Sequence, residues 1–484
     1  MNFQKFLQHS GLDHKQYQED GVMWCIEREH PLEQQEEEHQ SSPRYCNGGI
    51  IADEMGLGKT IMMIGTIVAN FKMPTLIVLP VVLLDQWKEQ FQRTTGHTPI
   101  VYHGQSTKSL SSNQLQNIPI ILTTYGTVLS DALKNKKLQQ VEWSRIICDE
   151  AHHLKNRRTK ITKAISSLQT KTMWLISGTP IQNHINDLFS LFDILKISKN
   201  VYTDMSKLND IIATIVLKRT KTEVGIQLPC LNVNRIQSKW TNIHEKELSN
   251  NIHERMAFIK GNTNSHNTSS ESKDKSHINP VTKGAVLSLM LYSRMMCVYP
   301  SLAKKHISNM KSTGYVNAET DVENGIKYSS KMDSVVETIL SRKNNENRKI
   351  IFTNFRGEID YLKSTLTSAG IVVDSIDGRV TSKRKRSDIL KKDLDVLILQ
   401  IKTGNEGLNL QQYNEVYFVT PEWNPKMEEQ AIARCHRIGQ KKGVHVFRFI
   451  MDNFNNEQKT SNIEMYTETI QNSKNEISRE IMCV

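Results

Sequence analysis

The sequence predicts an α/β protein in which two parallel-sheet units follow one another, with a mostly helical part between them. Short continuous runs of Val, Ile and Leu occur on both sides of the middle of the chain, and helix-like segments separate them. The chain also has 484 residues, more than one compact core usually holds. Its composition, 38% hydrophobic and 23% charged, is that of a globular chain.

The apolar runs indicate parallel strands buried on both faces, because such strands need no polar alternation. In the first half they occur at 48–52, 75–80, 119–124, 145–148 and 172–177. In the second half they occur at 349–353, 371–376, 395–400, 414–419 and 443–450. Residues from about 184 to 330 have a mostly helical pattern.

Two stretches without apolar periodicity help to divide the chain. Residues 33–44 are acidic and polar, and residues 261–279 contain almost no apolar side chain, so we expect both to be non-globular. We therefore expect a first sheet unit over 1–230, a helical linker or protrusion over 231–330, and a second sheet unit over 331–484.

Charge and cysteine usage restrict the classes of function. The 62 Lys and Arg residues exceed the 51 Asp and Glu residues, which gives a net charge of +11. A surplus of this size favours a polyanionic partner such as nucleic acid or an anionic membrane surface, although a basic protein without such a partner is an equal alternative. The seven cysteines form no C-x-x-C pair, so we expect neither a disulfide framework nor a zinc site.

Membrane insertion and secretion are not expected. The N-terminus has no apolar signal core, and the most apolar run, 75–84, is about half of the roughly 20 residues that a membrane span needs. We expect a soluble chain in a reducing compartment.

The strongest local signal is a phosphate-loop pattern at 53–60, between the first apolar run and a helical pattern. Gly56 and Gly58 allow the backbone N–H groups to point at phosphate. Lys59 would reach the β- and γ-phosphates, and Thr60 would ligate Mg²⁺. Asp53 stands where the strict pattern has its first glycine, and a glycine-rich helix start without function is the alternative.

The apolar run 145–148 ends in two acidic residues, Asp149 and Glu150. A carboxylate at the end of a strand beside a phosphate loop is where Mg²⁺ is held, which suits Asp149. Glu150 can then orient or deprotonate the attacking water. The alternative, a solvated turn, is weaker when a phosphate loop precedes it in the same unit.

These residues and their order resemble the Snf-type (Swi/Snf-like) DNA-dependent ATPases of helicase superfamily two. Further matching segments follow in that family's order at 14–24, 79–80 with 86–87, 123–125, 177–183, 217–221, 349–355, 377–378, 403–410, 422–425 and 430–440. The resemblance covers about 12–450. It implies two tandem RecA-like lobes that use ATP and Mg²⁺, and it assigns adenine recognition to Gln18.

The last matching segment has a physical logic of its own. Gln430, Arg434 and Arg437 are spaced i, i+4, i+7, which predicts that they share one face of a helix. The two arginines would stabilise negative charge on the γ-phosphate from the opposite lobe, so hydrolysis would require the lobes to close. A basic, solvated helix face is the alternative.

The chain also departs from the family. Glu422 stands in place of the first of two tryptophans, so any stacking by that residue is missing. The insert 33–44 resembles the subgroup of post-replication-repair and transcription-termination ATPases, but we expect no zinc-binding RING module because the sequence has no C-x-x-C pair. Among short members of the family, the chain is similar to the baculoviral global transactivators. The basic run 383–386 suggests phosphate contact or nuclear import, and a solvated helix face is its alternative.

The resemblance implies an ATP hydrolase that translocates on double-stranded DNA, with little sequence preference because phosphates supply most contacts. Transcription regulation or DNA repair in a nucleus is the expected setting, with nucleosomes or the transcription machinery as further partners. A nucleic-acid-binding transcription cofactor with an incidental ATPase and a strand-separating helicase remain alternatives.

Overall fold

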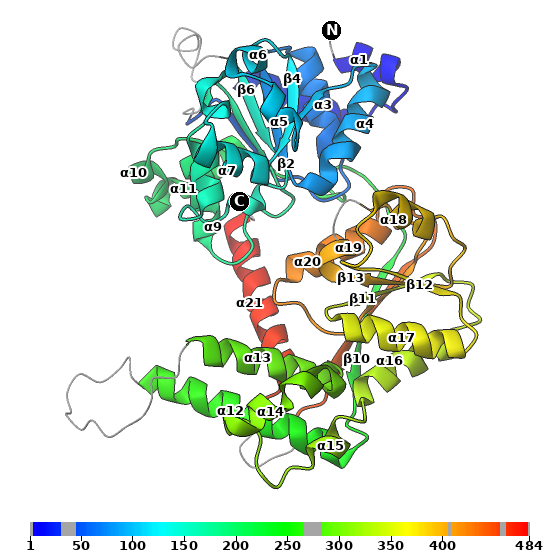
Figure 1. The fold of residues 1–484 in the computed structure, drawn as a ribbon. Helices are drawn as coiled ribbons and strands as arrows, with labels where there is room; N and C mark the ends of the chain where they lie inside the picture. The colour runs from blue at the N-terminus through cyan, green and yellow to red at the C-terminus, as the bar shows by residue number, and fades with distance from the viewer. Residues whose placement is uncertain (1–2, 31–44, 266–282, 405–407, 455–460, 483–484) are drawn as a thin grey trace, which may run out of the picture. The chain divides into compact units, whose positions relative to one another are not determined.

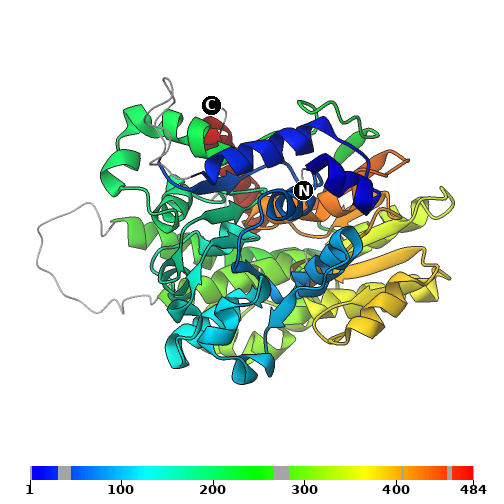
Figure 2. The same ribbon diagram turned by 90° about the horizontal axis from the view of Figure 1, so that it is seen from above.

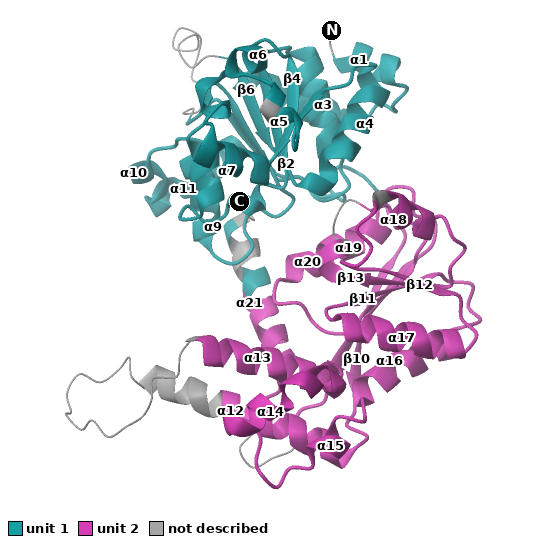
Figure 3. Ribbon diagram, in the orientation of Figure 1, with its two compact units in different colours: residues 1–227, 474–484 teal, residues 228–473 magenta. Residues whose placement is uncertain are grey.

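The computed structural model describes residues 3–30, 45–265, 283–404, 408–454 and 461–482. It divides into two compact units, which Figure 3 shows in different colours. The first comprises residues 1–227 and 474–484, and the second comprises residues 228–473. Each unit is described by itself.

The first unit is built on a seven-stranded sheet in which every neighbouring pair is parallel (Figure 1). Its order is β3-β4-β2-β6-β8-β1-β9. The strands are β1 (Gly48–Ile51), β2 (Thr75–Leu79), β3 (Ile100–Tyr102), β4 (Ile120–Thr124), β6 (Arg145–Cys148), β8 (Met173–Ile176) and β9 (Val216–Leu217). A separate ladder pairs β5 (Glu142–Trp143) with β7 (Gln169–Thr170).

Helices cover both faces of this sheet, because successive side chains of each strand point to opposite faces. Ile50 and Ile146 belong to one buried apolar cluster, whereas their neighbours Ile51 and Ile147 belong to another. On the second face lie α1 (Phe3–Ser10), α2 (Gln16–Arg28), α3 (Lys59–Ala69) and α4 (Leu84–Thr95). The dark blue helices α1 and α2 both pack against α3 (Figure 2).

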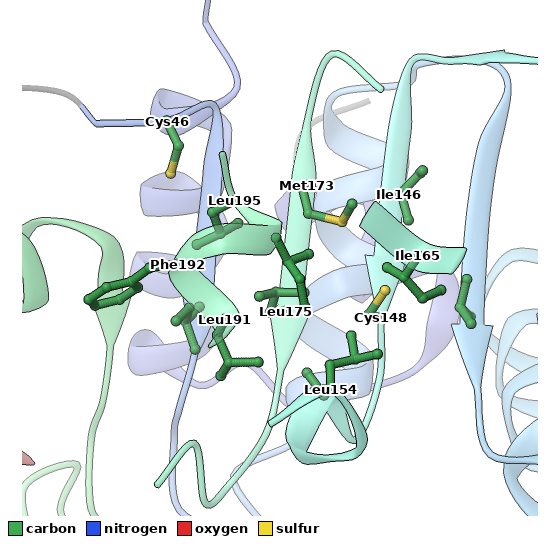
Figure 4. Packing of buried hydrophobic residues seen from close by; sticks show 14 of the residues in the cluster. Cys46, Ile146, Cys148, Leu154, Ile165, Met173, Leu175, Leu191, Phe192 and Leu195 are labelled. Carbon is green, nitrogen blue, oxygen red and sulfur yellow. The ribbon is translucent and has the colours of Figure 1, made fainter. Parts of the chain in front are cut away.

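The other face of the first sheet is covered mainly by α7 (Tyr125–Lys134), α8 (Lys160–Ser166), α9 (Ile185–Ile194) and α11 (Met205–Ile215). Figure 4 shows part of this layer, where Ile146 and Leu175 from the strands meet Ile165 and Leu191 from the helices. The short helices α5 (Ser106–Ser109), α6 (Ser112–Gln116) and α10 (Lys199–Tyr202) complete the unit.

The second unit contains a six-stranded parallel sheet with the order β10-β15-β14-β11-β13-β12. The strands are β10 (Leu231–Ser238), β11 (Lys349–Thr353), β12 (Val373–Ile376), β13 (Val396–Gln400), β14 (Glu415–Phe418) and β15 (Val444–Met451). The helices are α12 (Ile243–Ser265), α13 (Lys283–Val298), α14 (Ile307–Ser312), α15 (Val322–Gly325), α16 (Ser330–Ser341), α17 (Arg356–Ser368), α18 (Lys383–Leu390), α19 (Ile401–Gly404) and α20 (Pro425–Cys435). Helix α21 (Ile463–Met482) begins in this unit, and its end is counted with the first.

All ten predicted apolar runs form strands, and the predicted two-sheet α/β class is confirmed. The expected helical part 231–330 contains the helical pair α12 and α13, but it begins with a strand, β10. This strand escaped prediction because it lies at the sheet edge, where polar side chains are tolerated, and most of its residues are exposed. Whether 231–330 is a domain of its own stays a prediction; in the structure it belongs to the second unit.

The two stretches expected to be non-globular lie mostly outside the described residues. This holds for 33–44 and for 266–279. Residues 261–265 are described, and there the expectation was wrong, since α12 continues to Ser265. Within the described part of the chain, no helix is both long enough and apolar enough to cross a bilayer.

Candidate nucleotide site and nucleic-acid groove

The predicted phosphate loop joins the end of β1 to the start of α3. Gly56 and Gly58 have φ angles of +94° and +83°, a region that favours glycine because other residues carry a Cβ. Gly58 is the residue before α3, and no side chain caps this helix end. The N–H groups of the first turn, which includes Lys59 and Thr60, therefore present a positive helix terminus at the loop.

Lys59 folds back over its own loop. Its Nζ donates hydrogen bonds to the carbonyl oxygens of Asp53, at 2.7 Å, and Glu54, at 3.3 Å. Burial lowers the pKa of Lys59, and the nearby carboxylates of Glu150, Asp53 and Asp149 oppose that change. The loop lysine and the predicted acidic pair are thus close enough to act on one another, although they are 90 positions apart in sequence.

Asp149 follows the C-terminal end of β6 and is held in a defined orientation. Its Oδ2 accepts a hydrogen bond from the indole Nε1 of Trp87 at 2.7 Å, and its Oδ1 accepts one from the Glu150 N–H at 2.8 Å. Burial, and then the charge of Glu150, raise the pKa of Asp149 to about 6. A divalent cation would favour the ionised form of this carboxylate.

Glu150 has a φ of +50°, a conformation uncommon for a residue other than glycine. Its carboxylate lies 3.2 Å from Nδ1 of His152, and its side chain is partly exposed. Backbone conformations of this kind cluster at functional sites. The two predicted acidic residues therefore differ, since Asp149 is buried and fixed while Glu150 can meet solvent.

Gln18, assigned to adenine by the resemblance, lies on α2 against the phosphate loop. Its Nε2 donates to the carbonyl oxygen of Leu57 at 3.0 Å, and the side chain is buried. A Cβ placed on Gly58 would lie 2.5 Å from this Nε2. Glycine is therefore required at 58 both by its backbone angle and by the close approach of Gln18.

The residue that weakens the strict loop pattern, Asp53, forms an ion pair that the sequence did not reveal. Asp53 is fully buried, and Arg219 donates to both of its carboxylate oxygens, at 3.1 and 2.6 Å. The adjacent Glu54 pairs in the same way with Lys221 at 2.7 Å. The matching segment 217–221 thus fixes the phosphate loop, and the buried acid at 53 was the signal for a basic partner.

The matching segment 177–183 also reaches this loop. A Cβ on Gly178 would lie 3.4 Å from Lys59 Nζ and 3.1 Å from Met55 Cγ. Among the described residues, the buried hydroxyl of Thr179 has no hydrogen-bond partner. An unpartnered buried hydroxyl on the residue after Gly178, which approaches the loop lysine, suits a site that receives a further polar group.

A groove of about 530 Å³ lies at the C-terminal ends of β2 and β4 in the same unit. The matching segments 79–80 and 123–125 both contribute to it, through Pro80, Thr124 and Tyr125. Thr124 caps α7 by accepting a hydrogen bond from the Thr127 N–H at 3.1 Å. His153 also lines the groove, and its ring lies 5.5 Å from that of Tyr125.

In the second unit, Gln430 and Arg434 lie on α20 as predicted, but Arg437 does not. Helix α20 ends at Cys435, so the expectation that all three side chains share one helix face was wrong. His436 Nε2 is 2.8 Å from the carbonyl oxygen of Pro229 and donates to it, which holds the chain in a turn. This contact across 207 positions ends the helix, and spacing alone could not predict it.

The residues present fit a nucleotide with a divalent cation. A helix start without a side-chain cap, a lysine and an unpartnered threonine hydroxyl suit phosphate. The oxygens of Asp149 each accept one hydrogen bond, and a carboxylate has about four acceptor positions, so further positions exist for Mg²⁺. Thr60, the other expected Mg²⁺ ligand, lies in the first turn of α3.

Comparisons with known proteins agree with this site. The chain is 30% identical over 505 residues to an uncharacterised ATP-dependent helicase of Mycoplasma genitalium, covering 98% of this chain and 43% of the relative. It is 27% identical over 447 residues to human chromodomain-helicase-DNA-binding protein 6, covering 84% of this chain and 16% of the relative. The chain thus spans less than half the length of these relatives.

Among solved structures, the helicase domain of Hef from Pyrococcus furiosus matches with a TM-score of 0.56. The two are 16% identical, and the match covers 94% of this chain and 98% of that chain. At this identity the likeness concerns the fold alone, and it confirms the expectation of two tandem RecA-like lobes.

Two family models cover most of the chain. The model of the SNF2-related domain matches residues 17–302, and that of the helicase conserved C-terminal domain matches residues 330–439. The Snf-type resemblance is therefore confirmed, and the chain belongs to the SNF2-related family of ATP-dependent helicases.

Proposed function

We propose that the chain is an ATP-hydrolysing motor that translocates on double-stranded DNA with little sequence preference. The observation that carries this proposal is the convergence of a phosphate loop and an acidic pair at one edge of the first sheet. Ligand sites of open parallel sheets lie at this edge, outside the carboxyl ends of the strands. The names of the relatives, an ATP-dependent helicase and a helicase-DNA-binding protein, support the same activity.

Each site residue of the first unit has a role in this proposal. Lys59 and the first turn of α3 bind phosphate, while Asp149 and Thr60 hold Mg²⁺, which would neutralise charge on the transferred phosphoryl group. Glu150, partly exposed beside the buried Asp149, orients the attacking water and accepts its proton. Gln18, which lies against the loop, would recognise adenine.

The second unit contributes Gln430, Arg434 and Arg437. Arg434 lies in the last turn of α20, and Arg437 lies in the turn that follows. We propose that both arginines stabilise charge on the γ-phosphate, as guanidinium groups do in other phosphoryl transfers. Because Arg437 is outside the helix, the two side chains approach from different backbone segments and are not equivalent.

DNA is proposed to contact the first unit at the groove beside α7. The N-terminus of α7 opens there, next to Thr124 and Tyr125, and a helix N-terminus favours an anion. Contacts to phosphate position a protein on the duplex but carry no sequence information. Weak sequence preference follows.

The decisive experiment measures the ATPase rate against double-stranded DNA, single-stranded DNA, RNA and nucleosomes. We expect the largest stimulation with double-stranded DNA. Glu150→Gln should lower kcat by about 10²- to 10⁴-fold, the range for loss of a general base. Glu142→Gln, an exposed glutamate of the same unit, is the matched control and should leave kcat unchanged. Equal rates with and without DNA would overturn the proposal.

Translocation is separated from strand separation by two assays. A motor that tracks the duplex displaces a third strand from a DNA triplex while leaving a forked duplex intact. Unwinding of the fork would instead support a strand-separating helicase. If Glu150→Gln, without ATPase activity, still performs the cellular role, that result would support the alternative of a DNA-binding transcription cofactor.

For the biological setting, we propose transcription regulation or DNA repair in the nucleus. Arg384 and Lys385 of the basic run at 383–386 are exposed on α18, whereas Arg386 is half-buried and donates to the carbonyl oxygen of Val380. Their replacement by alanine in a fluorescent fusion should reduce nuclear accumulation, whereas replacement of Lys391 and Lys392 should not. Equal accumulation of all forms would remove this part of the proposal.

A further inference from the structure

Asp149 is contacted by two buried side chains from other parts of the first unit. Trp87, 1% exposed, donates its indole N–H to Oδ2 at 2.7 Å. Tyr125, 6% exposed, donates its hydroxyl to the backbone carbonyl oxygen of Asp149 at 2.6 Å. The side chain and the backbone of this residue are thus each held by one aromatic donor.

Both donors belong to segments that line the groove. Trp87 lies in the first turn of α4, which follows a short 3₁₀ turn, Val81–Leu83. Pro80 and Val81 at the start of that turn line the groove, only a few residues before Trp87. Tyr125 is the first residue of α7 and lines the groove itself.

These connections are short, and the side chains along them are packed. Trp87 packs against Phe91 on the same helix, with ring centroids 6.3 Å apart, and lies in the apolar cluster that contains Ile147 of β6. Tyr125 packs against His153, which follows Asp149 and Glu150 in the chain. A displacement of either groove segment therefore moves a hydrogen-bond donor of Asp149, because packed side chains transmit strain.

From this geometry we infer that Trp87 and Tyr125 are positioning residues that connect occupation of the groove by nucleic-acid phosphate to the orientation of Asp149. The inference rests on the proposed function, since it explains how DNA would stimulate ATP hydrolysis. Phosphate in the groove fixes the 3₁₀ turn and the start of α7, and the two donors then fix the carboxylate that holds Mg²⁺. Misplacement of such a group by about 1 Å can cost about 100-fold in rate.

The test compares variants that lose one donor each but keep the ring. Trp87→Phe removes the indole N–H, and Tyr125→Phe removes the hydroxyl. We expect the DNA-stimulated kcat to fall about 10-fold or more for Trp87→Phe and a few-fold for Tyr125→Phe, within the range for displaced catalytic groups. The rate without DNA is measured for each variant as well, because both donors already contact Asp149 in the absence of DNA. The ratio of the two rates reports the coupling, and it should fall below the wild-type ratio.

Two buried aromatics of the same unit serve as matched controls. Trp174 donates its indole N–H to a buried carboxylate as well, Glu29 Oε1 at 2.8 Å, and Tyr202 donates its hydroxyl to Asp193. None of these four residues lines the groove. Trp174→Phe and Tyr202→Phe should keep the wild-type stimulation ratio even where they lower the melting temperature.

A binding measurement gives a second readout that needs no turnover. Coupling between two sites is reciprocal, so a non-hydrolysable ATP analogue with Mg²⁺ should change the Kd for DNA of the wild type. In Trp87→Phe this change should shrink, while the Kd for DNA without nucleotide stays close to that of the wild type, because Trp87 does not line the groove. Tyr125→Phe alters the groove lining, so for this variant the ratio of the Kd with nucleotide to the Kd without it is compared with the wild-type ratio. If both donors act through Asp149, the loss in the double variant should be smaller than the product of the single losses.

The outcomes separate the two proposals. A wild type that does not respond to DNA would remove the proposed function and this inference with it. Wild-type stimulation that persists in both variants would overturn this inference alone. It would also be overturned if the two control variants lost stimulation to the same extent. Should Trp87→Phe fail to fold, Tyr125→Phe decides by the same ratio.

Discussion

Asp149 in the first unit and Glu415 in the second are both buried carboxylates at the ends of parallel strands, but they have different hydrogen-bond and ion-pair partners. Asp149 follows the C-terminal end of β6 and takes its hydrogen bonds from an indole and a backbone N–H. Glu415 begins β14 and accepts from Arg342, Asn345, Asn347 and the Tyr417 hydroxyl. In the ion pairs formed by described residues, Glu415 has two cationic partners and Asp149 has none.

The pKa directions follow from these surroundings. Burial raises the pKa of Asp149 to about 6, whereas at Glu415 the hydrogen bonds from Arg342 and Tyr417 overcome burial and lower the pKa. The chain therefore supplies a counter-charge where a carboxylate stabilises the fold. At the C-terminal edge of the first sheet, the charge of Lys59 acts on Asp149 but no cation among the described residues forms an ion pair with it, and the Mg²⁺ of the proposed function would supply that partner.

The comparison is tested most directly by removing each charge. Glu415→Gln should lower the free energy of unfolding by about 3–5 kcal/mol, because Arg342 and Lys349 lose a buried partner. Asp149→Asn should leave the free energy of unfolding unchanged or raise it, while kcat falls at least about 100-fold. Replacement of a residue that only supports a metal ligand already lowers metal affinity or activity by about 10- to 100-fold. Urea unfolding and ATPase rates measure both. Equal losses of stability would contradict the distinction.

Replacement of Arg219 tests Asp53, a fully buried carboxylate that lies in the phosphate loop and also has a cationic partner. Arg219→Lys keeps the charge but loses the two-point contact to Asp53, so we expect a loss of about 1–3 kcal/mol and a raised KM for ATP. Arg235→Lys, which alters an exposed pair with Glu468, should cost less than about 1 kcal/mol. Similar effects of the two changes would show that burial at Asp53 is unimportant.

The dependence of stability on pH should have opposite signs for the two carboxylates. Asp149 has a raised pKa in the folded state, so its contribution is present at low pH and is lost as the pH rises from about 4 to about 6. Glu415 has a lowered pKa, so its contribution is present above its ordinary value of 4.5 and is lost as the pH falls below it. The free energy of unfolding is measured from pH 2.5 to 7.5 for the wild type, Asp149→Asn and Glu415→Gln, and the difference between the wild type and each variant is plotted against pH. Parallel slopes would refute it.

The smallest expected effect concerns the loop glycine. Gly58→Ala meets both an unfavourable φ of +83° and the Gln18 amide, so we expect a loss of about 1–2 kcal/mol and weaker ATP binding. Gly96→Ala has a similar φ of +72° with nothing within 4 Å, and it isolates the backbone part. Adding Gln18→Ala to Gly58→Ala should relieve the steric part only. No difference between the two alanine variants would mean that Gln18 moves away freely.

The fold was largely predictable because most of its strands are buried on both faces, and the sequence of such a strand is a continuous apolar run. The strands that escaped are at or near sheet edges or are very short, such as β10 and β9, where composition is weakly constrained. Helix α3 was predictable from its apolar face and the glycine that precedes it.

At the site, motif spacing placed Lys59, Asp149 and Glu150, whose grouping follows from strand order. It could not reveal the pair of Asp53 with Arg219, which are 166 positions apart and meet because β9 lies beside β1. It also misplaced Arg437, since the helix end depends on a contact with a distant carbonyl oxygen. Whether the site residues have the catalytic roles assigned to them stays a prediction.

The pairs that hold the phosphate loop lie close to where the chain leaves the first unit. Lys221 and Arg219, which bind Glu54 and Asp53, precede the end of that unit at residue 227 by only a few positions. A pulling force on the chain after residue 227 would act first on the ion pair of Lys221 and next on that of Arg219. Only after these pairs break would it separate β9 from β1. Two ion pairs would thus transmit a pulling force on the connecting chain to the conformation of the phosphate loop.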